Sequence, residues 1–68
     1  MNINIRENVI NKIKNDDNNE IIKTIDESVI TGDELVLPGL GVMLELFWND
    51  LTNDQKTNIA NIIRNKIK

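Results

Sequence analysis

The twelve residues from Leu37 to Trp48 constrain the fold more than any other part of the chain. They hold the only Pro, two of the three Gly, and the only Phe and Trp among 68 residues. As a helix, this stretch would be apolar around most of its circumference, so the apolar faces of neighbouring helices would have to cover it. A chain this short buries only about 60% of its unfolded surface, so a monomer would be marginally stable. We therefore expect one domain over residues 1–68, with this stretch at its centre.

Two secondary structures compete over the central stretch. A helix that begins near Pro38 would place large apolar side chains on one face, with Glu45 and Asn49 opposite. A strand over residues 42–48 would instead leave Glu45 between two large apolar groups. Proline also suits a first helical turn, where its missing N–H would have had no partner. The pattern favours a helix over about residues 39–49, whose apolar face comprises Leu40, Met43, Leu44, Phe47 and Leu51.

Capping signals predict three further helices. Each begins with a side chain that can accept a hydrogen bond from the first turn, followed three residues later by Glu or Gln. The first helix is predicted over about residues 5–15, and the second ends at Gly32, which suits a left-handed turn. A short extended piece is expected at residues 35–37, because a residue before proline avoids helical dihedrals. The capping pairs are Asn4 with Glu7, Asp17 with Glu20, and Thr52 with Gln55. Together these elements predict an all-α fold, a compact bundle of four short helices around the central apolar one.

The composition lacks the usual catalytic groups. With no His, Cys or Tyr, the common general base, thiol nucleophile and zinc ligands are missing. Ser28 has no His to activate it and is interpreted as a surface serine. Gly39 and Gly41 form a Gly-x-Gly pair, but position 44 is Leu, so they are interpreted as turn residues rather than a dinucleotide site. We therefore predict no enzyme activity, no cofactor, no metal site and no small-molecule substrate.

Two residues of the central stretch admit a functional interpretation. Trp48 would act either as an anchor of the core or as an interface hot spot. Glu45 interrupts an apolar run and would either face solvent or make a specific polar contact. The candidate core or partner-contact residues are Leu37, Pro38, Gly39, Leu40, Met43, Phe47 and Trp48, and the candidate polar contact is Glu45.

A resemblance appears in this same stretch. Leu37-Pro38-Gly39-Leu40-Gly41-Val42, followed by Glu45 and Trp48, resembles the signature of the small acid-soluble spore protein I family. The family comprises minor proteins of the dormant spore core and has no established biochemical activity, so the resemblance implies a place and time of action rather than a reaction. It implies as partners a second copy of the chain or another spore protein. Weaker agreement extends to Asn4, Arg6, Val9, Ile10 and Gly32-Asp33-Glu34.

Charge and hydropathy limit the partners further. The net charge is −3, and residues 18–37 carry five acids against one Lys, which repels phosphate. Residues 52–68 are locally +3 but show no basic stripe, so no nucleic-acid partner is expected. The longest uncharged run, residues 35–44, is far shorter than the roughly 20 residues that cross a bilayer. Residues 1–14 lack the apolar region of a signal peptide. We therefore expect an intracellular protein without a membrane segment.

A more distant resemblance leaves an alternative fold open. Residues 32–41 are similar to the turn into the first hairpin of histone-like bacterial nucleoid proteins, which also begin with two helices. That resemblance implies an α+β dimer with a β-hairpin at 34–48 and a DNA-associated architectural function. Against it, the following strands and the basic DNA-embracing arm of those proteins are missing from the sequence.

Overall fold

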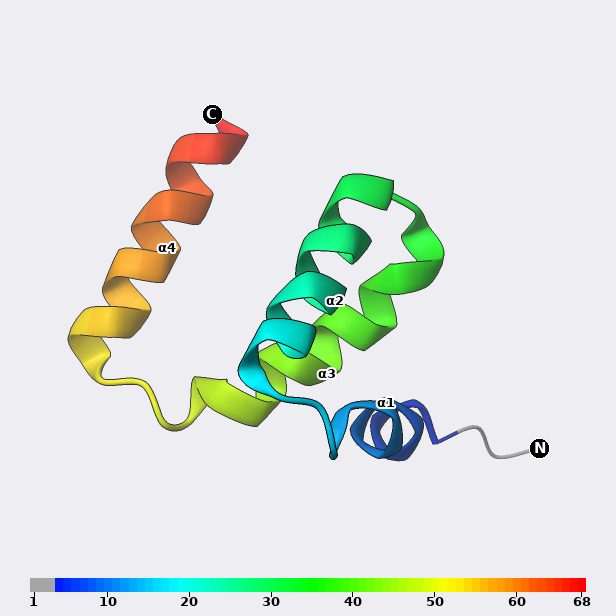
Figure 1. Cartoon of the computed structure of the whole chain (residues 1–68). Helices are drawn as coiled ribbons and strands as arrows, with labels where there is room; N and C mark the ends of the chain where they lie inside the picture. The colour runs from blue at the N-terminus through cyan, green and yellow to red at the C-terminus, as the bar shows by residue number, and fades with distance from the viewer. Residues whose placement is uncertain (1–3) are drawn as a thin grey trace.

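The computed structural model describes residues 4–68 and shows an all-α arrangement over that range (Figure 1). Its elements are α1 (Ile5–Ile13), α2 (Asn18–Thr31), the short 3-10 helix η1 (Glu34–Val36), α3 (Leu37–Trp48) and α4 (Asn53–Ile67). The prediction of four helices is confirmed. The alternative β-hairpin at 34–48 is wrong, because the same residues form η1 and α3. The histone-like interpretation thereby loses the element on which it was based.

Local capping fixes where the helices begin and end. In α1 and α2 the backbone N–H of the third helical residue donates to the side chain of Asn4 or Asp17 at 2.9 Å. Before α4, Thr52 and Gln55 form a complete capping box, with donor–acceptor distances of 3.1 and 2.8 Å. Gly32 ends α2 at φ 64°. These predictions from sequence are confirmed. Two helices differ in their bounds: α1 ends at Ile13 rather than near residue 15, and α3 covers Leu37–Trp48 rather than about residues 39–49.

The segment before Pro38 differs from the predicted extended piece. Asp33 Oδ1 accepts a hydrogen bond from the backbone N–H of Leu35 at 2.9 Å and winds the chain into η1. Leu37 then adopts φ −59° and ψ −43°, so it is helical although a proline follows. The steric preference of a residue before proline is modest, and here the preceding turn overrides it. Pro38 lies in the first turn of α3, where its missing N–H removes no helical hydrogen bond.

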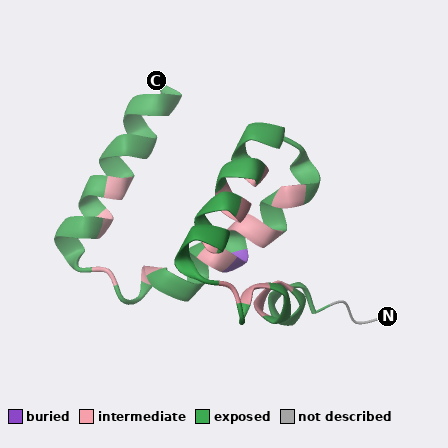
Figure 2. Cartoon of the chain, in the orientation of Figure 1, coloured by how far each residue is buried: buried purple, intermediate pink, exposed green. Residues whose placement is uncertain are grey.

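The closest helix packing is between α1 and one face of α3. A Cβ added to Gly39 would lie 3.9 Å from Val9 Cγ2, so α1 approaches α3 at this glycine. Val42 follows one turn later on the same face and is 6% exposed. It is the one buried residue in the part of the chain that the structure describes (Figure 2). The interpretation of Gly39 and Gly41 as turn residues is wrong, because both lie inside α3.

The arrangement around α3 is looser than the predicted compact bundle. The radius of gyration is 13.5 Å, against about 11 Å for a compact chain of this length. Figure 1 shows the reason, because α4 (orange to red) stands apart from α2 and α3 and joins them only through the end of α3. In residues 4–68 no helix has both the length and the apolar character that a membrane crossing requires.

Candidate functional site

A bidentate ion pair fastens α1 to α3. Arg6 Nε donates to Glu45 Oε2 at 2.8 Å, and Arg6 Nη2 donates to Glu45 Oε1 at 3.0 Å. The two residues lie 39 positions apart in the sequence. Two parallel bonds to one carboxylate fix the angle between the helices better than a single contact would. Glu45 thus makes a specific polar contact although its side chain is largely exposed.

The ion pair shifts the pKa of both partners. The hydrogen bond from Arg6 lowers the pKa of Glu45 from its ordinary value of 4.5; partial loss of hydration opposes this shift, and the positive charge of Arg6 adds a smaller decrease. The hydrogen bond to Glu45 and its negative charge raise the pKa of Arg6. The charged forms of both groups are therefore the ones that the fold favours.

The pH dependence of stability should reflect this pair. A lowered pKa in the folded state means that Glu45 stabilises the fold above pH 4.5, and that this contribution is lost as the pH falls through the lower folded value. We expect Glu45→Gln to lower the melting temperature at neutral pH and to reduce its decrease on acidification. Thermal unfolding at neutral and acid pH, followed by circular dichroism, measures both effects.

Glu27→Gln is the matched control for this measurement. The Glu27 carboxylate lies 4.0 Å from Lys23 on the same helix and joins no second helix. Its loss should leave the melting temperature at neutral pH close to that of the native chain, because an exposed ion pair within one helix contributes little to stability. Equal behaviour of the two variants would show that the Arg6–Glu45 pair does not hold α1 on α3.

A hollow of about 530 Å³ lies between α1, α2 and the start of α3. It gathers one group of the candidate residues from the central stretch, together with polar side chains from α1 and α2. The hydroxyl of Ser28 borders it and donates to the carbonyl oxygen of Thr24 at 2.9 Å, so this serine is engaged with the backbone. The candidate residues in the hollow are Pro38, Gly39, Leu40 and Met43.

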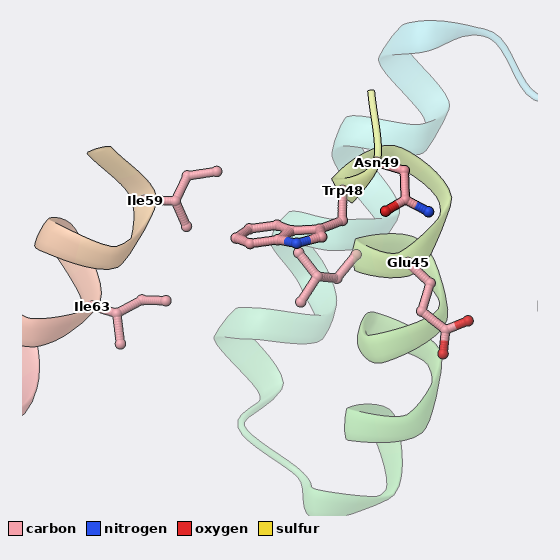
Figure 3. Close-up of a pocket in the computed structure, with 6 residues that line it drawn as sticks. Glu45, Trp48, Asn49, Ile59 and Ile63 are labelled. Atoms are coloured by element: carbon pink, nitrogen blue, oxygen red, sulfur yellow. The ribbon is translucent and has the colours of Figure 1, made fainter. Parts of the chain in front are cut away.

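An apolar groove of about 550 Å³ separates α3 from α4. Figure 3 shows the Trp48 ring reaching toward α4, while Ile59 and Ile63 point back toward it. The Glu45 carboxylate points away from the ring at the edge of the groove. Leu44 and Asn49 complete its lining. We refer to these six residues as the α3–α4 groove.

One contact of α4 with α3 is electrostatic. Lys56 Nζ lies 5.5 Å from the centroid of the Trp48 ring, a distance typical of a cation–π contact. Trp48 is half-buried, so its ring is neither enclosed in a core nor fully in water. Sequence reasoning placed Trp48 among the candidates but missed Lys56, Ile59 and Ile63. Their helical spacings of three and four residues were visible in the sequence, but nothing in it showed that they face α3 across a groove.

Two other candidates lie on the surface. Leu37 is 58% exposed and Phe47 is 43% exposed, so neither belongs to a core within the single chain. Contact with a partner stays a prediction for both. No group of three or more acidic side chains suited to hold a metal ion occurs within residues 4–68. Most of the candidate residues therefore border apolar surface, in the hollow, in the α3–α4 groove or on the outside of α3.

Comparison with known proteins finds one and the same family description in the family model and in the relatives. The family model described as "Small, acid-soluble spore protein I" matches residues 3–67. Relatives with that same name are 33% identical over 60 residues in Halalkalibacterium halodurans, covering 88% of each chain, and 32% identical over 68 residues in Bacillus licheniformis, covering 100% of this chain and 97% of the relative. The Bacillus subtilis relative is 28% identical over 68 residues, covering 100% of this chain and 96% of its own. No solved structure matches.

Proposed function

This chain belongs to the small, acid-soluble spore protein I family, and from that premise we propose that it is a minor protein of the dormant spore core with a non-catalytic packing role. Its family makes it a spore protein. The packing role means that the chain acts by its presence and by contact with other molecules of the spore interior, not by turning over a substrate.

The observation that carries this proposal is the apolar surface left uncovered on α3 and α4. Large apolar side chains on these two helices remain accessible, and patches of this kind on a small protein usually mark contact sites. The exposed ones are Leu37, Leu44, Leu46, Phe47, Ile62, Ile63 and Ile67. The chain has no His, Cys or Tyr, so contact chemistry is better supported by its side chains than acid–base or nucleophilic chemistry.

Fractionation of the producing bacterium tests the place of action. An antibody against this chain should detect it in spores stripped of their coats and at least about tenfold less in growing cells of equal total protein. A ribosomal protein, present in both fractions, serves as the loading control. Equal amounts in growing cells and stripped spores, or recovery in the removed coat fraction, would contradict the proposal.

A further inference from the structure

We propose that the α3–α4 groove is occupied by a second copy of this chain, in a two-fold symmetric dimer that places α4 of each copy against α3 of the other. This inference rests on the packing role proposed above and names the partner that the role requires. In a symmetric dimer the same surface serves both copies, so one groove accounts for both halves of the interface.

The single chain exposes more area than a compact monomer of its mass. The chain exposes 6045 Å², whereas a compact monomer of 7.8 kDa would expose about 4,400 Å². The excess of about 1,600 Å² is roughly twice the 800 Å² that each partner contributes to a standard interface. Each chain can therefore bury an interface of standard size against a second copy and still expose at least as much area as a compact monomer would.

The α3–α4 groove is lined mainly by large apolar side chains. Its walls carry Trp48 and Leu44 from one helix and Ile59 and Ile63 from the other, and Ile63 is 53% exposed. Beyond the groove the apolar face of α4 continues to Ile67, which is 77% exposed. When two such α3–α4 pairs interlock, four helices surround one apolar centre, which is the packing of a four-helix bundle. The partner then supplies the covering that the chain's own α1 and α2 do not reach.

Charge is unevenly distributed along the chain. Residues 4–51 carry four basic and ten acidic side chains, for a net charge of −6, whereas residues 52–68 carry four basic and one acidic, for +3. The positive α4 of one copy therefore meets a negative body in the other. A nucleic acid would be repelled by most of this surface, and a membrane surface would gain no electrostatic attraction from its acidic residues. A second copy offers the opposite charge in both halves of the contact, because the positive α4 of each chain faces the negative residues 4–51 of the other.

Sedimentation equilibrium of the full chain tests the proposal. We expect a mass of twice 7.8 kDa at micromolar concentration and dissociation on dilution. The Trp48 emission should shift to shorter wavelength with increasing concentration, because the partner removes water from the groove. Ile63→Glu should weaken self-association at least about 100-fold, since it places a charge in the centre of the apolar contact.

Ile22→Glu is the matched control. Ile22 is an isoleucine about as exposed as Ile63, but it lies on α2 and does not line the groove. This variant should stay dimeric, and circular dichroism should show native helix content in both variants, because neither residue is buried. A native chain that stays monomeric at high micromolar concentration overturns the proposal, and so does a dimer that Ile63→Glu leaves intact. If the chain is a monomer, the packing role in the spore core still stands, with a different protein as partner. If the chain is equally abundant in growing cells and stripped spores, that role is contradicted whatever the oligomeric state.

Discussion

Replacing Val42 with Asp is expected to abolish the packing of α1 on α3 and, with it, the cooperative unfolding of the chain. Val42 is 6% exposed and lies between Gly39 and Glu45 on the face of α3 that α1 covers. A carboxylate there would lose its hydration, and Arg6 on α1 is already bound to Glu45. The penalty of several kcal/mol for a buried charge is comparable with the roughly 3–10 kcal/mol that a chain of this length has in total.

Thermal unfolding followed by far-ultraviolet circular dichroism measures this effect. Leu46→Asp is the control, because it introduces the same side chain one turn further along α3, where the native residue is 50% exposed. It should cost less than about 1 kcal/mol, as most surface substitutions do. If both variants unfolded to the same degree, the α1–α3 contact around Val42 would not be the centre of the fold.

The same substitution, Gly to Ala, should have opposite signs at Gly32 and Gly41. Gly32 ends α2 at φ 64°, where a Cβ costs about 1–2 kcal/mol. Gly41 lies inside α3, and a Cβ added there meets no atom within 4 Å. Alanine at position 41 should therefore stabilise the chain by up to about 1 kcal/mol through its higher helix propensity.

Melting temperatures give a direct comparison of the two variants. For a domain of this size, a difference of about 1 kcal/mol moves the melting temperature by roughly 4–8 °C. We expect a decrease of at least this size for Gly32→Ala and an increase for Gly41→Ala. A decrease for Gly41→Ala would mean that another molecule approaches α3 closely at this position.

Local features of the fold were predictable because their causes lie within a few residues. A cap such as Thr52 with Gln55 acts over three positions, so sequence and structure show the same interaction. The left-handed end of α2 follows from Gly32 alone. The 3-10 turn η1 was not predicted, because the rule for a residue before proline and the Asp33 cap point to different conformations and only their balance decides.

Contacts between helices were not predictable in the same way. The central helix is apolar on several faces, so its periodicity could not show that the face with Gly39 and Val42 is the one that α1 covers. The partner of Glu45 lies 39 residues away, a separation over which sequence spacing carries no geometric information. The opposite charges of Arg6 and Glu45 were the one available signal, and their side chains meet only after the helices have packed.

The surface position of the ionisable side chains has a consequence in strong acid. No charged group is buried in residues 4–68, the range that holds all eleven Asp and Glu and all eight Lys and Arg. On titration below the isoelectric point of about 4.7 the molecule changes from a polyanion with formal charge −3 to a polycation whose Lys and Arg contribute +8. Coulomb repulsion between like-charged molecules then opposes precipitation, whether the chain is folded or not. Precipitation should therefore be confined to a narrow range around the isoelectric point, with clear solutions on both sides of it.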